Sequence, residues 1–227
     1  MSPSTPAQAW AELAAGNARF AADRAVRPHA DAEQRRLVST GQRPFAAVLG
    51  CSDSRVAAEL VFDRGLGDLF VVRTAGHALD SAVLGSLEFA SAMLQVPLLV
   101  VLGHDSCGAV NAAIRARRDG QVPGGFLRDI VERVTTSVLA AERSGPASAD
   151  DVVREHVRAT ARQVVERSET VREAVLAGRL GVVGARYTLA DGRVEAVSER
   201  GVATAYPGSG NDLADPPVPG LVTDARQ

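Results

Sequence analysis

The sequence contains no lysine, since all 25 basic residues among its 227 are arginines. This absence excludes a conventional P-loop and any Schiff-base or pyridoxal-phosphate chemistry, because each needs a lysine amine. The formal net charge of −2 gives no electrostatic basis for binding nucleic acid or an anionic membrane. No apolar run approaches the ~20 residues that span a bilayer, and the N-terminus lacks the basic and apolar regions of a signal peptide. We therefore expect a cytoplasmic protein with no nucleic-acid or membrane partner.

Aromatic residues make up only 4% of the chain, and there are only two cysteines, Cys51 and Cys107. With so few aromatics, the core must be built mostly from valine, leucine and alanine. Two cysteines in a chain without a secretion signal favour metal binding or catalysis over a disulfide.

The apolar runs in the central part of the chain do not alternate with polar residues, and they are separated by helical patterns. Strands are predicted at 45–50, 69–72 and 97–102, which is typical of a parallel sheet covered by helices on both faces. Two later runs, 180–189 and 193–198, are joined by Asp-Gly, a strong hairpin signal. The sequence therefore predicts an α/β fold, with a central, mostly parallel sheet flanked by helices and a C-terminal hairpin.

We predict one domain over residues 1–200, opened by an N-terminal helical arm at about 5–41. The first helix of this arm carries an apolar stripe that includes Trp10 and Leu13, and it precedes the first strand. We expect the arm to pack on a partner subunit. Residues 201–227 are rich in proline, glycine and aspartate and are predicted to be a flexible tail.

Both cysteines follow buried-looking strands. Cys51 comes directly after the first strand, and His104 and Cys107 follow the third. Since ligands of parallel α/β sheets bind beyond the carboxyl ends of the strands, these three side chains are expected to meet. Two thiolates and one imidazole, with the fourth position open, form the pattern of a catalytic zinc site. Two thiolates cancel the charge of Zn²⁺, so a bound water should ionise above the ~7 of three-histidine sites, and a zinc-bound hydroxide should act as nucleophile with activity that rises toward alkaline pH.

Asp53 and Arg55 follow Cys51 closely and admit two interpretations. Asp53 is a candidate fourth metal ligand in a closed state, unless Arg55 holds it in a bidentate salt bridge. The alternative is a turn-stabilising hydrogen bond from Asp53 and a surface arginine. A thiol hydrolase with Cys107 as nucleophile is a further alternative, but it leaves the position of Cys51 unexplained.

The other histidines have no ligand-like neighbours in the sequence. His156 lies on a helix rich in charged residues and is expected to face solvent. His77 directly follows the segment Arg73-Thr-Ala-Gly76 and is a weaker candidate for a place near the pocket.

Two motifs, Cys51-Ser-Asp-Ser-Arg55 and Gly103-His-Asp-Ser-Cys-Gly108, resemble those of β-class carbonic anhydrases. The resemblance extends from about residue 10 to residue 198. It implies reversible hydration of carbon dioxide to bicarbonate and a proton, with one zinc on Cys51, His104 and Cys107 and with Asp53 and Arg55 as a catalytic pair.

The resemblance also implies substrate-binding positions. Gln42 is similar to a glutamine of the plant-type subgroup that reaches the site of a neighbouring subunit, and Phe70 matches an aromatic of the carbon dioxide pocket. Phe89 falls where that subgroup often has tyrosine, and Gly108 completes the set; ordinary core packing is the alternative for both phenylalanines. The resemblance further implies a homodimer or homotetramer with sites at the interface. The other functions to consider are a related zinc hydrolase of carbonyl sulfide or carbon disulfide, and a non-catalytic zinc or redox sensor.

Overall fold

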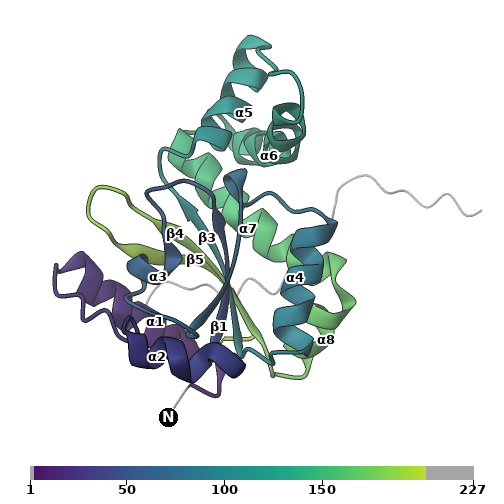
Figure 1. The fold of residues 1–227 in the computed structure, drawn as a ribbon. Helices are drawn as coiled ribbons and strands as arrows, with labels where there is room; N and C mark the ends of the chain where they lie inside the picture. The colour runs from purple at the N-terminus through teal and green to yellow at the C-terminus, as the bar shows by residue number, and fades with distance from the viewer. Residues whose placement is uncertain (1–2, 203–227) are drawn as a thin grey trace, which may run out of the picture.

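Five strands form a single sheet in the order β2-β1-β3-β4-β5 (Figure 1). The computed structural model describes residues 3–202, and the predicted tail falls almost entirely outside this range. The strands are β1 (Ala46–Cys51), β2 (Leu69–Thr74), β3 (Leu98–His104), β4 (Gly181–Tyr187) and β5 (Val194–Arg200). The first four are parallel, and β5 runs antiparallel to β4. The predicted sheet and its C-terminal hairpin are therefore confirmed.

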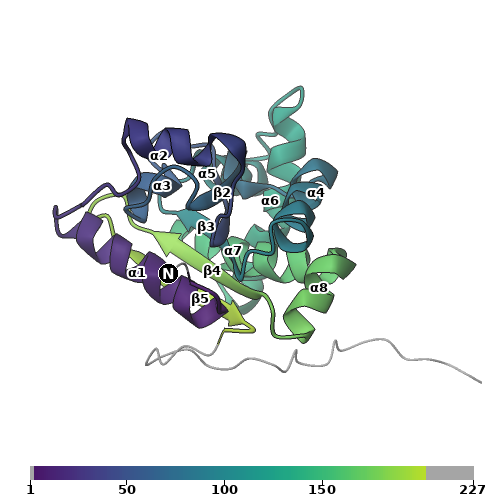
Figure 2. The same ribbon diagram turned by 60° about the horizontal axis from the view of Figure 1, so that its bottom comes forward.

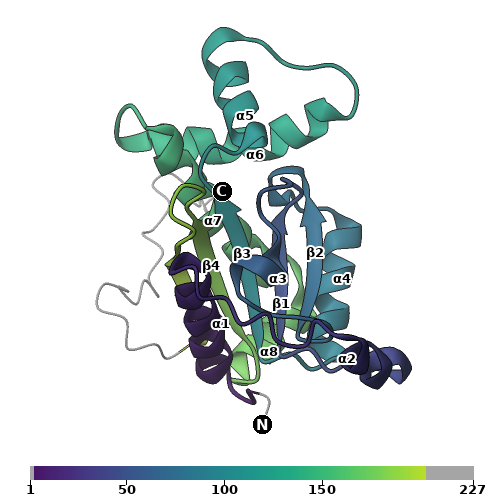
Figure 3. The ribbon, with the colours of Figure 1, turned by 60° about the vertical axis from the view of Figure 1, so that its left-hand side comes forward.

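Helices cover both faces of this sheet. The longer ones are α1 (Pro6–Ala21), α4 (Ser81–Ala92), α5 (Gly108–Asp119), α6 (Leu127–Ala141), α7 (Ala149–Arg167) and α8 (Glu169–Leu176). The short ones are α2 (Ala32–Leu37), α3 (Ala58–Val61), η1 (Val38–Thr40), η2 (Ala75–His77) and η3 (Glu142–Ser144). Residues of α1 and α3 pack on one face, whereas α4, α7 and α8 pack on the other. Figures 1 and 3 show α5 and α6 rising beyond the carboxyl ends of the strands, so this edge of the sheet has a helical wall.

The two central strands explain why the apolar runs do not alternate. Every residue of β1 and of β3 is buried, because each strand has a neighbour on both sides and helices above and below. The edge strands β2 and β5 are only partly buried along their length. Of the helices that the structure describes, none is long and apolar enough to cross a membrane.

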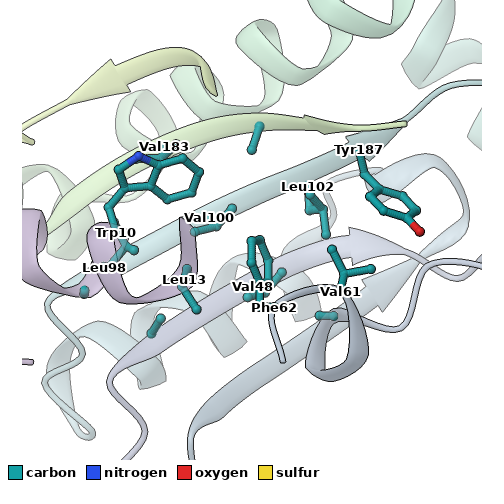
Figure 4. Packing of buried hydrophobic residues seen from close by; sticks show 14 of the residues in the cluster. Trp10, Leu13, Val48, Val61, Phe62, Leu98, Val100, Leu102, Val183 and Tyr187 are labelled. Atoms are coloured by element: carbon teal, nitrogen blue, oxygen red, sulfur yellow. The ribbon is translucent and has the colours of Figure 1, made fainter. Parts of the chain in front are cut away.

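The apolar stripe of α1 packs on this chain's own sheet and needs no partner subunit to cover it, so a partner contact of α1 stays a prediction. Ala9 and Leu13 are 0% exposed and lie in one cluster with Val48 and Val100 of this chain's own sheet (Figure 4). Figure 2 shows α1 lying across β4 and β5. An apolar stripe specifies an apolar surface to cover, but not the chain that supplies it.

Two polar anchors hold α1 against its own chain. The side-chain amide of Asn17 donates to the carbonyl oxygens of Val61 (3.0 Å) and Gly192 (2.8 Å), and its oxygen accepts from Val194 N–H. The buried carboxylate of Asp63 then accepts from Arg19 and from backbone N–H groups of the segment that follows α1. Helix α2 has no buried residue, and a partner contact on α2 likewise stays a prediction.

Candidate metal centre

The structure brings Cys51, His104 and Cys107 together at the carboxyl ends of β1 and β3. Cys51 is the last residue of β1, His104 is the last of β3, and Cys107 caps the N-terminus of α5. One donor atom from each residue lies within 4.8 Å of the others, and all three side chains are buried. Ser106, at φ 54°, makes the left-handed turn that brings Cys107 back beside His104.

The hydrogen bonds of His104 suit a metal ligand. Its Nδ1 lies 2.7 Å from the carbonyl oxygen of Asp105 and must donate to it, since a carbonyl only accepts. In the neutral imidazole, Nε2 then carries a lone pair, and this buried atom has no hydrogen-bond partner among residues 3–202. A metal-ligating histidine typically donates its other N–H to a carbonyl or carboxylate in this way. The three donors therefore fit a thiolate-binding metal such as zinc.

The two thiols share their protons unequally. A hydrogen bond with Cys107 lowers the pKa of Cys51 to about 4 against the effect of burial, helped by His104 and by the backbone N–H groups of Asp53 and Gly76. The same thiol–thiol hydrogen bond, together with burial, raises the pKa of Cys107. For His104, burial alone would lower the pKa, but the neighbouring thiolate of Cys51 outweighs this effect and raises the pKa. The cluster thus already stabilises a thiolate.

Asp53 and Arg55 form a bidentate pair beside the cluster. Arg55 Nε donates to Asp53 Oδ1 at 2.9 Å and Nη2 donates to Oδ2 at 2.6 Å, while the backbone N–H of Arg55 also donates to Oδ1. The pairing with Arg55 holds the pKa of Asp53 well below its usual range. Asp53 Oδ2 lies 3.9 Å from His104 Nε2, so the carboxylate borders the donor cluster while it remains paired with Arg55.

Arg73 is a structural member of the site to which the sequence assigned no role. Its Nε donates to the carbonyl oxygen of Cys51 at 2.9 Å, and its Nη2 donates to that of Asp53 at 2.7 Å. The signal was its place in the strand beside β1, where Arg73 pairs with Gly50. Its role is to fix the loop that carries Cys51 and Asp53.

The expectation that His156 faces solvent is wrong. The residue is 4% exposed and hydrogen-bonds to Ser137 and to the carbonyl oxygen of Gly76. Helix α7 packs against both the sheet and α6, so it is buried on two sides despite its many charged residues. His77 is also buried, and its ring lies 4.4 Å from that of His156, centroid to centroid.

The four expected substrate-binding positions divide into two groups. Gly108 directly follows Cys107, and a Cβ added there would meet nothing within 4 Å, so space is open next to the cluster. The rings of Phe70 and Phe89 lie 6.0 Å apart, with Phe89 45% exposed, but Phe70 pairs with Ala47. That register places Phe70 four residues, about 13 Å along the strand, from Cys51. Gln42 is exposed in the segment before β1. One chain therefore does not bring Gln42, Phe70 and Phe89 to its own cluster.

The Cys-His-Cys cluster lies at the carboxyl ends of the central strands of a parallel α/β sheet. This arrangement is typical of a metalloenzyme site. Residues 46–194 match the carbonic anhydrase family model. The chain is 52% identical over 201 residues to a carbonic anhydrase of Mycolicibacterium smegmatis, covering 88% of this chain and 98% of that protein. It is equally identical over 193 residues to carbonic anhydrase 2 of Mycobacterium tuberculosis, with 85% and 93% coverage.

Comparison with solved structures identifies the class of carbonic anhydrase. The β-carbonic anhydrase of Coccomyxa is 25% identical, with a TM-score of 0.64 over 85% of this chain and 84% of that one. The tetrameric β-carbonic anhydrases of Sordaria macrospora include a chain that is also 25% identical, with a TM-score of 0.64 over 82% of this chain and 95% of that one. The chain therefore belongs to the carbonic anhydrase family, in its β class, and its reaction is the reversible hydration of carbon dioxide to bicarbonate and a proton.

Proposed function

We propose that this carbonic anhydrase holds one zinc ion per chain on Cys51, His104 and Cys107. The observation that carries the proposal is the convergence of three donor atoms within 4.8 Å, one of them the unpartnered Nε2 of His104. When bound, zinc supplies a Lewis acid that lowers the pKa of a water to the range in which it serves as a nucleophile. Since two thiolates offset the charge of the ion, activity is expected to rise toward alkaline pH.

Asp53 orients the nucleophile in this proposal, and Arg55 orients Asp53. The carboxylate remains ionised and acceptor-only, and its pairing with both guanidinium nitrogens fixes its plane beside the cluster. It is thus placed to accept a hydrogen bond from a reacting water and to hold it in one direction. In a closed state, Asp53 would leave Arg55 and take the fourth position on the metal.

We further propose that Gln42, Phe70 and Phe89 complete the site of a neighbouring chain. The two phenylalanines form an apolar pair suited to carbon dioxide, while Gln42 offers an amide for a substrate oxygen. Phe70 lies about 13 Å along the sheet from its own Cys51, and Gln42 precedes the strand that Cys51 ends, so these residues would reach a metal centre across an interface between chains. The relatives from Sordaria macrospora are described as tetrameric. Gly108 leaves room for substrate within the same chain.

Mixed oligomers test this assignment directly. Chains with Cys107→Ser lack a metal ligand, and chains with Gln42→Ala lack the donated amide, so each homo-oligomer should have little activity. If Gln42 acts across the interface, a co-expressed hybrid contains one site with every group intact and recovers activity. No recovery in purified hybrids would place Gln42 outside the neighbouring site.

We place the enzyme in the cytoplasm as a homodimer or homotetramer, with residues 1–200 as its single domain. The comparisons do not favour a hydrolase of carbonyl sulfide or carbon disulfide, nor a non-catalytic sensor. Metal analysis tests the zinc proposal. The protein is expected to bind about one zinc per chain, and Cys107→Ser should lose both zinc and turnover. Full activity in metal-free protein would contradict the proposal.

A further inference from the structure

A chain of three hydrogen bonds leads from α6 to the thiol of Cys51. The hydroxyl of Ser137 lies 2.9 Å from His156 Nδ1, and His156 Nε2 lies 2.8 Å from the carbonyl oxygen of Gly76. The backbone N–H of Gly76 then donates to Cys51 Sγ at 3.3 Å. Ser137 lies on α6 and His156 on α7, and both side chains are buried.

The chemistry of the partners fixes the direction of each hydrogen bond. A carbonyl oxygen only accepts, so His156 Nε2 carries the proton and donates to Gly76. Burial lowers the pKa of His156, so the ring is neutral and Nδ1 accepts from the Ser137 hydroxyl. Ser137 therefore selects the tautomer and ring orientation that His156 needs in order to hold Gly76.

The backbone conformation of Gly76 requires support from its neighbours. It adopts φ 61° and ψ 28°, and a Cβ at this position would lie 2.7 Å from the Cβ of Ala109. Any side chain is strained at this position, yet glycine also moves most readily to other backbone conformations. The N–H and C=O of Gly76 belong to different peptide units. His156 therefore acts by fixing the orientation of Gly76, and not by polarising the N–H that reaches sulfur.

We infer that His156, supported by Ser137, is a positioning residue for the metal-binding thiolate of Cys51. By holding Gly76, it keeps an N–H group on the sulfur, which fixes the sulfur and reduces the negative charge that it donates to a metal. Outer-shell groups of this kind typically change metal affinity by about 10–100-fold when they are removed. The inference rests on the proposed zinc site.

The test compares His156→Phe with His156→Gln. Phenylalanine keeps a ring beside His77 but removes both hydrogen bonds, whereas the glutamine amide can still donate to Gly76 from a position close to that of Nε2. Ser137→Ala is the milder variant, because it frees the ring but leaves the donor in place. Val164→Ala is the matched control: it creates a buried cavity in the same helix without touching Gly76.

Two measurements are made on each protein. Zinc affinity is measured by competition with a chromophoric chelator, and the thiolate-to-cobalt charge-transfer band is recorded after Co²⁺ substitution. We expect His156→Phe to weaken zinc binding by about 10–100-fold and to shift the band, with Ser137→Ala intermediate and His156→Gln close to wild type. Val164→Ala should lower thermal stability without changing either reading.

The outcomes separate the inference from the proposed function. Wild-type protein that binds neither zinc nor cobalt would overturn the proposed zinc site. Wild-type binding with unchanged affinity and band in both His156→Phe and Ser137→Ala would overturn the inference alone. If His156→Phe does not fold, Ser137→Ala decides, since a role for the hydrogen-bond chain requires its band to move while that of Val164→Ala does not.

Discussion

The replacement Gly76→Ala puts the packing around the metal centre to a quantitative test. Alanine at φ 61° incurs a left-handed strain of about 1–2 kcal/mol. Its Cβ would lie 2.7 Å from that of Ala109, and overpacking of this kind costs about 1–3 kcal/mol. Alanine also lowers the conformational entropy of the unfolded chain, which offsets about 0.4–1 kcal/mol of this loss of stability. The net expectation is a loss of about 3 kcal/mol in the free energy of unfolding.

The assay is urea unfolding at fixed protein and zinc concentrations, because bound metal and association both shift apparent stability. Ala109→Gly provides the control, since it removes the Cβ that the new alanine would meet. The double variant should recover the overpacking component, which gives a favourable coupling energy of about 1–3 kcal/mol in the double-mutant cycle. A midpoint for Gly76→Ala equal to that of wild type, or a coupling energy near zero, would refute the close approach of η2 to α5.

Other predictions concern the carboxylates and the anchoring of α1. The pKa of Asp53 is depressed in the folded state, so its pairing with Arg55 stabilises the protein above the unfolded pKa of about 4 and is lost as pH falls through the lower folded pKa. The difference in urea midpoint between wild type and Arg55→Ala should therefore be constant above about pH 5 and shrink below about pH 4; a difference that grows in acid would contradict this sign. Asn17→Ala strands three backbone groups and should cost about 2–4 kcal/mol of unfolding free energy, whereas an unchanged thermal midpoint would mean that α1 does not dock on its own chain.

The sequence predicted the sheet and the donor cluster for a physical reason. Fully buried central strands must be continuous apolar runs, and residues that follow such runs in parallel strands meet at one edge. Cys51 and His104 end two adjacent strands, and Cys107 returns through a single turn, so their meeting required no knowledge of the helices around them.

Features that depend on the packing of helices could not be predicted from the sequence. The many charged residues of α7 predicted a solvent-exposed helix, although the sheet and α6 cover it on two sides. The burial of His156 and its contact with Gly76 were therefore missed. The stripe of α1 could not say whose sheet it covers, because the decisive contacts are those of Asn17 with residues 44 to 177 positions away. The separation of Phe70 from Cys51 follows from the strand register, which the sequence does not reveal. Because of this separation, the expected substrate-binding residues of one chain are candidates for the site of a neighbouring chain.

Stopped-flow hydration of carbon dioxide from pH 6.5 to 9, on protein whose zinc content has been quantified, tests the central claim most directly. The account predicts rapid turnover that scales with bound zinc, at most one per chain, and that rises with pH. Asp53→Ala should alter this profile without removing the metal. Absence of turnover across this range in fully zinc-loaded, folded oligomers would contradict the assignment of Cys51, His104 and Cys107 to a catalytic centre.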